Sequence, residues 1–383
     1  MTRVGDIFDP VHYAKVRRPL LEAETLPHWC YTSQDFFDRE IARIFLRSWN
    51  FVGRADEVPN PGDYLTADDL AGGPVLVVRG KDNEVRAFAN SCRHRGARLL
   101  KGAGNCRRIV CPYHSWIYAL DGALIGSSGM EDTIGFERAD YGLVPVRLET
   151  WGGFMFVAFD PSCPSLMEYL GDLPQQFASY SFDDMLCTRR KEYDLACNWK
   201  LYLENIEVYH TTTIHRGSFG TQRADLETTR GQWDALHMPG DETCAVLPGE
   251  TTPFPQIATL RGKPKKGTYF TLIYPNALFS STHDCFWWTV IYPKGPERSR
   301  LSLGFCFPKR TVALPNFNEI VQTYYRRWDL SIPEDDVAVQ AQQEGLRSPL
   351  RGPGRLSSME PVVHVFDNWV LDRVLDGRAT ARA

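Results

Sequence analysis

The sequence predicts an α+β fold in which a small all-β domain precedes a domain that combines a sheet with helices. Short runs of Val, Ile and aromatic residues between Gly and Asn turns fill residues 45–160, as expected for strands joined by hairpins. Longer strand patterns occur between residues 269 and 307, and helical patterns follow them to residue 375. The length of 383 residues suits two such domains.

Composition and charge argue against several classes of protein. The chain is 43% hydrophobic and 12% aromatic, which is ample for two cores. A net charge of −4 without a basic block argues against nucleic-acid binding. No apolar run reaches the length of about 18 residues that a membrane span needs. Asp6 and Asp9 stand where a secretory signal would be apolar, so we expect a cytoplasmic protein whose ten scattered cysteines are reduced.

Residues 1–44 are predicted to form a helical segment. Phe36, Phe37 and Ile41 recur at helical spacing, and Ser33 stands where an N-cap is expected. At the other end, the polar residues 376–383 are predicted to be a frayed tail.

Two Cys–His pairs carry the most specific signal in the chain. One residue separates Cys92 from His94, two residues separate Cys111 from His114, and residues 95–110 lie between the pairs. Two thiolates and two imidazoles are the ligand set of a Rieske [2Fe-2S] centre, in which Cys binds one iron and His the other. A structural Cys2His2 zinc site is the alternative, because it uses the same residue types on short loops.

The segments around these pairs favour iron–sulfur chemistry. Strands are predicted over residues 75–78 and 85–88, and Asp121-Gly122 marks a further hairpin after the second pair. Both pairs are therefore expected at the tips of β-hairpins, whereas a ββα zinc finger carries a helix. Cys-x-His followed by Cys-x-x-His on hairpins resembles the Rieske domain of ring-hydroxylating oxygenase α subunits, and residues 47–53 and 151–157 also resemble that family.

A second group of metal-ligating residue types follows at residues 198–215. The run from Asn198 to His210 has helical periodicity without Gly or Pro, so one helix is predicted to carry Glu207 and His210 on the same face. His215 falls slightly off that face, which predicts a bend or a loosening of the helix. Two His and a carboxylate form the facial triad of non-haem Fe(II) oxygenases. On their own, two His five residues apart fit a satisfied core His or a zinc site equally well.

The third ligand is expected from the acidic triplet at residues 334–336. Together with residues 343–346, the triplet resembles the Glu-Asp…Gln-x-Gly-Leu segment of the same family. The resemblance places the iron ligand at Asp335, with Asp336 as the second choice. The triplet also suits the first turn of a helix behind Pro333, where carboxylates stabilise the helix dipole. The two interpretations are compatible.

Glu207 departs from the commonest pattern of the family. Most members have Asp three residues before the first iron His, where it bridges that His to a Rieske His of the neighbouring subunit. The resemblance therefore implies a homotrimer in which Glu207 links His210 to His114 of the next subunit. A similar Glu occurs in the branch that oxidises carnitine-like quaternary ammonium compounds.

The resemblance further implies a helix-grip catalytic domain over residues 165–375, with an antiparallel sheet and with residues 1–44 packed on it. Its predicted strands are residues 269–273, 286–291 and 301–307, and its predicted helices are residues 316–330, 335–345 and 364–375. Five aromatic residues on or near these strands are candidates for the walls of an apolar pocket. About half of them should face the core instead, because strand side chains alternate between faces. They are Tyr269, Phe279, Phe286, Trp287 and Trp288.

The resemblance implies the terminal oxygenase of a Rieske non-haem iron system, with a [2Fe-2S] cluster, mononuclear Fe(II) at His210, His215 and Asp335, and O2 as cosubstrate. The expected reaction is monooxygenation, by hydroxylation or N-/O-dealkylation, of a small aromatic or N-alkyl substrate. Residues 352–355 lack the G-x-G-x-x-G fingerprint, so electrons from NAD(P)H must arrive through a separate reductase, with or without a ferredoxin. Three alternatives stay open: a ring-dihydroxylating α subunit, a Rieske electron-transfer protein and a zinc-stabilised binding protein.

Overall fold

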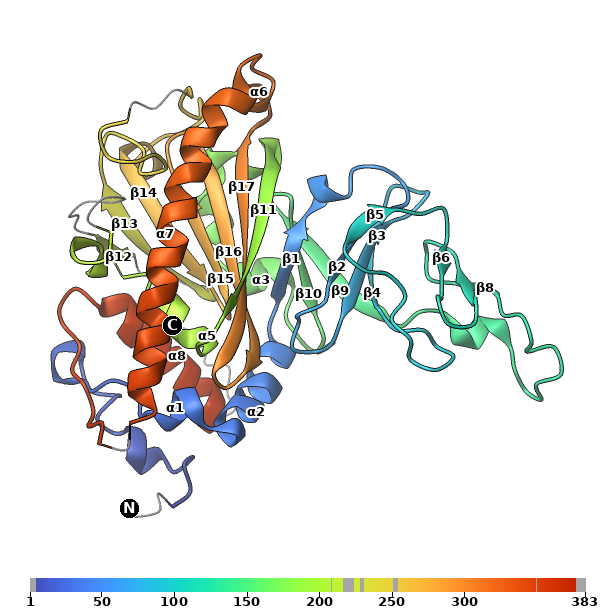
Figure 1. Ribbon diagram of the computed structural model, residues 1–383, viewed down its shortest axis with the longest axis horizontal. Coiled ribbons are helices and arrows are strands. Elements are labelled where there is room, and N and C mark those ends of the chain that lie inside the picture. The colour runs from blue at the N-terminus through green and yellow to red at the C-terminus, as the bar shows by residue number, and fades with distance from the viewer. Residues whose placement is uncertain are drawn as a thin grey trace. The chain divides into compact units, whose positions relative to one another are not determined.

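The computed structural model describes residues 5–207, 209–215, 224–227, 231–250, 254–348 and 350–376. The chain divides into two compact units, one made of Leu46–Leu166 and the other of Met1–Phe45 with Met167–Ala383. Strands dominate the first unit, and the second combines one large sheet with helices (Figure 1). The predicted α+β class is confirmed. Residues 377–383, which belong to the predicted tail, lie outside the described part of the chain.

The first unit contains a seven-stranded antiparallel sheet with the strand order β1-β10-β9-β4-β3-β2-β5. Its strands are β1 (Asn50–Arg54), β2 (Asp63–Ala67), β3 (Val75–Arg79), β4 (Val85–Ala89), β5 (Ala103–Asn105), β9 (Pro145–Trp151) and β10 (Phe154–Ala158). The predicted hairpin of β3 and β4 is confirmed, and its turn contains Asn83 with a φ of 67°. Asn tolerates this left-handed conformation better than most residues, which explains its place in the turn.

A three-stranded sheet completes the first unit, with the order β6-β7-β8. Its strands are β6 (Ile109–Val110), β7 (Ile117–Tyr118) and β8 (Leu124–Gly126). Trp116, Tyr118 and Phe88 form a buried core that also includes Cys92 and Cys111. The loops that carry the two Cys–His pairs are thus anchored by packed side chains at their base.

The sheet of the second unit has seven antiparallel strands in the order β11-β17-β16-β15-β14-β13-β12. They are β11 (Met185–Leu195), β12 (Asp225–Glu227), β13 (Trp233–Pro239), β14 (Gly267–Ile273), β15 (Ala277–Ser281), β16 (Phe286–Gly295) and β17 (Arg298–Pro308). The three strands predicted from the sequence correspond to β14, β16 and β17 and are confirmed. Every residue of β14 is buried, and so is most of β16, so both faces of this sheet are covered.

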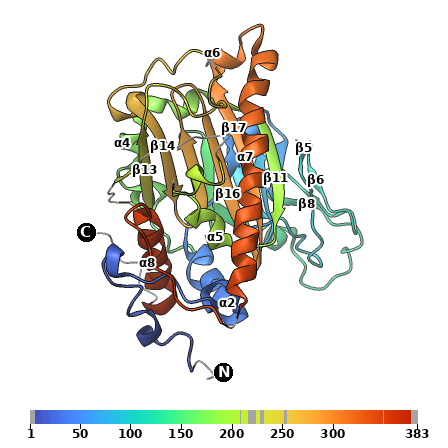
Figure 2. The ribbon, with the colours of Figure 1, turned by 60° about the vertical axis from the view of Figure 1, so that its left-hand side comes forward.

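Eight α-helices accompany these sheets in the described residues: α1 (Trp29–Thr32), α2 (Gln34–Arg43), α3 (Leu166–Leu170), α4 (Leu173–Gln176), α5 (Trp199–Glu204), α6 (Lys309–Val312), α7 (Phe317–Leu346) and α8 (Pro361–Asp376). In Figure 2 the long orange helix α7 runs along the sheet of the second unit. Helix α5 contacts α7, β16 and α8. None of the helices in the described residues is long and apolar enough to span a membrane.

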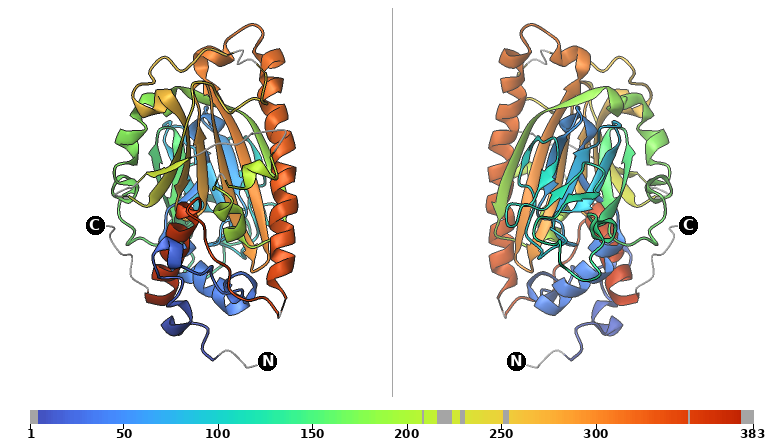
Figure 3. Two further views of the ribbon diagram at one scale, coloured as in Figure 1. Left: turned by 90° about the vertical axis from the view of Figure 1, so that its left-hand side faces the viewer. Right: turned by 90° about the vertical axis from the view of Figure 1, so that its right-hand side faces the viewer.

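The N-terminal helices belong to the second unit and lie beside the ends of α7 and α8 (Figure 3). Ser33 caps α2 as predicted, because its Oγ accepts a hydrogen bond of 3.4 Å from the backbone N–H of Phe36. Arg43 donates to the carbonyl oxygen of Val374 near the end of α8. The predicted C-terminal helix is confirmed as α8.

Helix α7 continues through Pro333, whereas the sequence predicted two helices separated there. That prediction was wrong. A proline inside a helix removes one backbone hydrogen bond and costs about 3 kcal/mol or more. Burial of an apolar stripe on both sides of the proline offsets this cost, since Trp328, Ile332, Val339 and Leu346 are all buried. The acidic triplet therefore lies in the middle of α7 and not in a first helical turn.

Helix α5 ends at Glu204, so the prediction of one helix from Asn198 to His210 was also wrong. The Glu207 side chain accepts hydrogen bonds from the backbone N–H groups of Tyr209 and His210. Such side-chain bonds to the local backbone compete with helical hydrogen bonding. His210 instead begins a separate 3-10 turn that extends to Thr212. Residue 208 of the predicted helix lies outside the described residues.

Candidate active site

The first Cys–His pair lies in a tight turn within the loop from β4 to β5. These two strands do not pair with each other, so the prediction of a hairpin tip was wrong for this pair. The backbone N–H of Cys92 donates to the carbonyl of Ala97, and the N–H of Gly96 donates back to Cys92, at 2.8 and 2.9 Å. Gly96 has a φ of 75°, a left-handed conformation that glycine adopts without steric cost. These two backbone hydrogen bonds close the turn, and His94 lies in the same turn as Cys92.

The second pair occupies the matching turn between β6 and β7. The N–H of Cys111 donates to the carbonyl of Trp116 at 2.8 Å, and the N–H of Ser115 donates to Cys111 at 3.1 Å. Ser115 has a φ of 56°, which is unusual for a residue with a side chain. Backbone strain of this kind is found where a loop must hold side chains in a set position.

The four side chains of the two pairs face one another. The rings of His94 and His114 lie 4.8 Å apart, and the ring of His94 stacks on Trp116 at 4.9 Å. Cys92 and Cys111 are buried, whereas His114 is exposed. The Nδ1 atom of His94 is buried and finds no hydrogen-bond partner among the described residues, as expected for a nitrogen that binds a metal.

The hydroxyl of Tyr118 contacts the turn that carries the first Cys–His pair. It lies 3.2 Å from the Sγ of Cys92 and accepts a hydrogen bond of 3.0 Å from the N–H of Arg93. Burial raises the pKa of the Cys92 thiol, the hydrogen bond to Tyr118 lowers it, and the neighbouring Cys111 thiol raises it further. A bound metal cation would supply the positive charge that stabilises both thiolates.

The two thiols and two imidazoles are the donor set of a two-iron Rieske cluster, in which Cys binds one iron and His the other. The rings of His94 and His114 lie side by side, as two ligands of one iron would.

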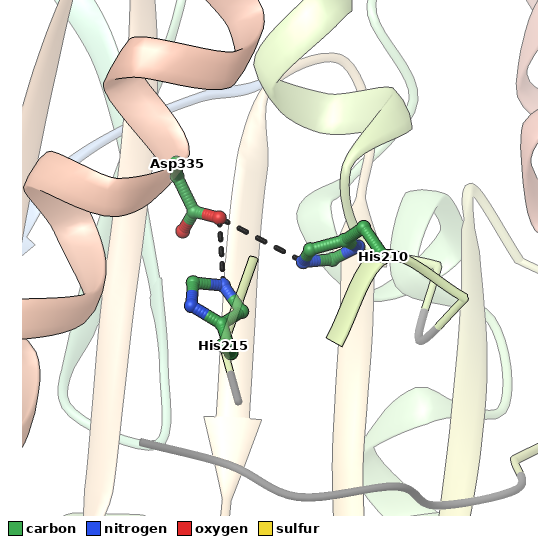
Figure 4. Close-up of side chains that lie close together, drawn as sticks. All are labelled: His210, His215 and Asp335. Carbon is green, nitrogen blue, oxygen red and sulfur yellow. Dashed lines mark hydrogen bonds and ion pairs between the residues drawn. The ribbon is translucent and has the colours of Figure 1, made fainter. Parts of the chain in front are cut away.

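His210, His215 and Asp335 converge from different elements in the second unit (Figure 4). The Oδ1 atom of Asp335, in the middle of α7, lies 2.8 Å from the Nε2 of His215 and 3.7 Å from the Nε2 of His210. The two imidazole rings are 5.1 Å apart. The structure thus brings Asp335, and not Asp336, into the group. Two imidazoles and one carboxylate fit a non-haem iron ion.

Each of these three side chains is held by a second polar group. The Nδ1 atom of His210 lies 3.1 Å from Glu207, and the Nδ1 of His215 lies 2.8 Å from Glu334. Asp335 accepts a hydrogen bond of 2.8 Å from the side chain of Asn205. Partners of this kind fix the orientation of metal ligands and raise their affinity for the metal.

The carboxylates govern the charge of His215. Its burial favours the neutral ring and alone would lower the pKa, but hydrogen bonds and Coulomb attraction from Asp335 and Glu334 outweigh burial and raise the pKa. The two carboxylates therefore stabilise positive charge on the His215 ring. When a metal ion is bound, the ion supplies the positive charge instead.

A pocket opens directly beside this group, with a volume of about 70 Å³. Its walls are aromatic and polar side chains from α5, α7 and the strands β14, β15 and β16. They include Tyr202, Phe270, Trp287, Ser280, Arg327 and Trp328, next to His210, His215 and Asp335. A small apolar cavity with a few convergent polar groups is the usual form of a substrate site.

Of the five aromatic candidates, about half of which were expected to face the core, Trp287 is the one that lines this pocket. Phe279 and Phe286 pack against each other with ring centroids 5.0 Å apart, and Tyr269 packs on His237 at 4.6 Å. Side chains alternate along a strand, so Trp288 points away from the face that Trp287 uses. By the same alternation, Phe270 faces the pocket in place of Tyr269.

Sequence reasoning missed four residues that complete the site: Asn205, Glu334, Arg327 and Trp328. Glu334 lies beside Asp335 in the acidic triplet, and Asn205 lies two residues before Glu207, so both were close to the motifs. Nothing in the sequence indicates that Arg327 and Trp328 lie on the pocket face of α7 until the helix is seen to continue through Pro333.

Comparisons with known proteins match both units. Residues 48–137 match the family described as "Rieske [2Fe-2S] domain". Residues 182–376 match the family described as "Ring hydroxylating alpha subunit (catalytic domain)". Together the two matches include all eight residues singled out above as candidate ligands or bridging residues.

Relatives of known activity align along most of the chain. The oxygenase subunit of carnitine monooxygenase from Escherichia coli K12 is 30% identical over 344 residues, which cover 88% of each protein. The chloroplastic choline monooxygenase of Beta vulgaris is 28% identical, with 94% of this chain and 79% of that protein covered. The apo crystal structure of a quaternary ammonium Rieske monooxygenase superimposes with a TM-score of 0.75 at 25% identity, covering 92% of this chain and 95% of that chain.

Proposed function

Since the chain belongs to the family of ring-hydroxylating α subunits, which are Rieske-type oxygenases, we propose that it oxidises a small quaternary ammonium compound. Two kinds of support favour this substrate class over an arene. The relatives reported above are named for carnitine and choline, both of which carry a trimethylammonium group. The pocket also offers Tyr202, Phe270 and Trp287 as aromatic faces, which attract such cations.

One observation carries the proposal: His210, His215 and Asp335 place their donor atoms within 4.8 Å of one another in the wall of an aromatic pocket. In our proposal these residues hold the mononuclear iron, and Cys92, His94, Cys111 and His114 hold the [2Fe-2S] cluster. When bound, the iron supplies the capacity to activate O2 and the cluster supplies electrons one at a time.

The surrounding residues orient the ligands and shape the pocket. Glu334 is hydrogen-bonded to the Nδ1 atom of His215, and Glu207 lies 3.1 Å from the Nδ1 of His210, so the Nε2 atom of each ring faces Asp335. Asn205 donates to Asp335 and limits the rotation of its carboxylate. Phe270, Trp287 and Trp328 exclude water from the space in which the substrate would lie.

The protein is the oxygenase component of a multicomponent system, and we propose a separate reductase as its electron donor. We further propose a homotrimer in which Glu207 links His210 to the exposed His114 of the neighbouring subunit. The carboxylate of Glu207 retains lone pairs for such a further hydrogen bond beyond those it accepts from the backbone N–H groups of Tyr209 and His210. We propose a cytoplasmic location, where a reductase can reach the protein.

A reconstituted assay tests this proposal. The protein, a generic reductase and NADH are combined with choline, carnitine, glycine betaine or naphthalene, and O2 uptake is compared with loss of each compound under ¹⁸O2. We expect at least one quaternary ammonium compound to be consumed with about one O2 per molecule and with one labelled oxygen retained in the products. Oxidation of naphthalene alone, with two labelled oxygens in its product, would contradict the substrate class.

A further inference from the structure

Two cysteines stand directly opposite each other in the sheet of the second unit. Cys187 on β11 and Cys306 on β17 are partners in the antiparallel register of these strands, and both are thiols in this structure. Among the strand residues that the structure describes, no other pair of cysteines is set opposite in this way. Opposite side chains of an antiparallel pair lie on the same face of the sheet, so the two thiols are neighbours.

The spacing of opposite residues suits a disulfide bond. Opposite Cα atoms of antiparallel strands lie about 4.5 or 5.5 Å apart, depending on the type of pair. Both values fall within the range of about 4.4–6.8 Å that a disulfide spans between Cα atoms. Opposite Cβ atoms lie about 4.5–5.5 Å apart and a disulfide needs about 3.5–4.5 Å, so the strands have to approach only slightly. The bond therefore requires no change in the register of β11 and β17.

The two thiols differ in their access to solvent. β11 is an edge strand of its sheet, and Cys187 on this strand is half-buried. The Sγ atom of Cys187 donates a hydrogen bond of 3.7 Å to the backbone carbonyl of Arg189. Cys306 lies one strand further into the sheet and is fully buried. A small oxidant in solution therefore meets Cys187 first, with Cys306 as the neighbouring thiol.

The residues that follow Cys187 attach β11 to α7. The register of β11 and β17 shifts between Cys187 and Arg189, as in a β-bulge. The Oγ1 atom of Thr188 lies 2.7 Å from the hydroxyl of Tyr325 on α7, and Arg189 donates two hydrogen bonds of 2.8 Å to Asp329 on the same helix. The thiol pair thus lies where the edge strand is bound to the helix that carries the carboxylate of the candidate iron site.

We propose that Cys187 and Cys306 form a peroxide-sensitive thiol pair, which closes to a reversible disulfide and so holds the edge strand and its attachment to α7. Hydrogen peroxide is the oxidant, and it forms when O2 takes up two electrons and two protons without oxidising a substrate. This source of peroxide rests on the proposed function, whereas the thiol pair itself does not. The bond closes a loop over residues 187–306 and thereby restricts the unfolded chain.

The oxidation takes two steps. The thiolate of Cys187 attacks one oxygen of the peroxide, the O–O bond breaks, and the departing hydroxide takes up the thiol proton and leaves as water, which gives a sulfenic acid. The sulfur of Cys306 then attacks the sulfur of Cys187, the S–O bond breaks, and a second water leaves with the proton of the Cys306 thiol. Two thiols lose two electrons in total, and one peroxide is reduced to two waters. A small thiol reopens the bond by exchange.

Disulfide mapping after peroxide treatment tests the proposal. The holoprotein is treated with a small molar excess of hydrogen peroxide, the remaining thiols are blocked with N-ethylmaleimide, and the unreduced peptides are analysed by mass spectrometry. We expect linked peptides that join Cys187 to Cys306, at least tenfold more abundant than any other linked pair and separated by dithiothreitol. The thermal midpoint should rise on oxidation and return to its starting value on reduction, because the bond restricts the unfolded chain.

Serine variants identify the two partners. Cys187→Ser and Cys306→Ser should each abolish the linked peptides and the rise in thermal midpoint. Cys163→Ser is the matched control, because Cys163 is 8% exposed and lies between β10 and α3, where its thiol donates to the carbonyl of Arg47 at 3.2 Å. This variant should form the link as the wild type does. If Cys306→Ser does not fold, Cys187→Ser decides, because its site is half-buried on an edge strand.

Three results would overturn the thiol pair: Cys187 recovered as a thiol or a sulfinic acid with no link to Cys306, links chiefly to another cysteine, or a thermal midpoint that falls on oxidation. The same preparation is assayed for oxidation of trimethylammonium compounds. Because the peroxide is added, a pair that closes in a protein without this activity would refute only the proposed function. An active protein whose two thiols stay unlinked would refute only the thiol pair.

Discussion

The Nδ1 atom of His210 lies 3.1 Å from the Oε1 atom of Glu207. On the other side of the site, His215 has the same relationship to Glu334 at 2.8 Å. Each imidazole therefore has its Nδ1 atom near an outer carboxylate. The Nε2 atoms of both rings point toward Asp335 (Figure 4). A hydrogen bond to Glu334 fixes the orientation of the His215 ring, which is the usual role of carboxylates behind metal-bound His.

Glu207 is predicted to carry electrons between subunits as well as to orient His210. Glu207→Ala should slow oxidation of the reduced cluster by about 10- to 100-fold, the cost typical for loss of a carboxylate behind a metal ligand. Glu207→Asp should retain substantial activity because it keeps the charge. Stopped-flow absorbance after mixing reduced protein with substrate and O2 measures this rate. Transfer at the wild-type rate in Glu207→Ala, with iron content unchanged, would show that Glu207 is not the bridge.

Asp335 and Asp336 make a matched pair for testing the third ligand. Asp335 lies 2.8 Å from His215, whereas Asp336 is not in the donor group. Asp335→Ala should lose the mononuclear iron and keep the cluster, so iron falls from about three to about two per chain. Asp336→Ala should keep all three. Iron analysis of both purified variants makes the comparison, and the reverse pattern would move the ligand to Asp336.

The sequence predicted the strands well, and it singled out the two His and the Asp that the structure brings together, because these signals are local. Strand patterns at β14, β16 and β17 and the Ser33 cap of α2 depend on neighbouring residues alone. The two helix predictions that failed did so because of contacts that the local sequence does not show. Packing on the sheet carries α7 through Pro333, and the Glu207 side chain ends the helical run near α5.

The pocket was the least predictable part of the site. Almost every residue of β14 and β16 is buried, so hydrophobic alternation cannot distinguish the face toward the site from the face toward the core. Phe270 and Trp287 turned out to face the pocket, and Tyr269 and Phe286 did not. Arg327 reaches the same pocket from a helix more than 30 residues further along the chain, a relationship that no sequence spacing encodes.

A buried ion pair ties the N-terminal segment to α5. The Nζ of Lys200 lies 2.6 Å from the Oε1 of Glu40, and both side chains are fully buried. Lys200→Met should destabilise the protein by about 3–5 kcal/mol, because it leaves Glu40 charged and unpaired in the core. The exposed pair of Lys15 and Glu24 is the control, and Lys15→Met should cost less than about 1 kcal/mol. Thermal midpoints of the two variants measure the difference, and equal shifts would contradict it.

Glu204 is predicted to make stability depend on pH. Burial raises its pKa from 4.5 to about 7, against the opposing hydrogen bond from Tyr31. Between pH 4.5 and pH 7 the folded protein holds a proton on Glu204 that the unfolded chain has lost. The contribution of this proton to the free energy of unfolding is therefore fully present below pH 4.5 and is lost as the pH rises to 7. The full loss is at most about 3 kcal/mol.

Glu204→Gln stays uncharged at every pH and isolates this contribution. The thermal midpoint of the wild type should fall relative to that of the variant as the pH rises from about 5 to about 8. Parallel pH profiles for the two proteins would show that Glu204 does not hold the proton.

Metal content tests the central claim that one chain carries both a Rieske cluster and a mononuclear iron site. The protein is purified without air, its iron and zinc are measured, and visible spectra are recorded before and after dithionite. We predict brown protein with about three irons per chain, two in the cluster and one at His210, His215 and Asp335, and bleaching on reduction. Colourless protein that holds zinc and no iron would contradict the claim and return the Cys–His pairs to a structural role.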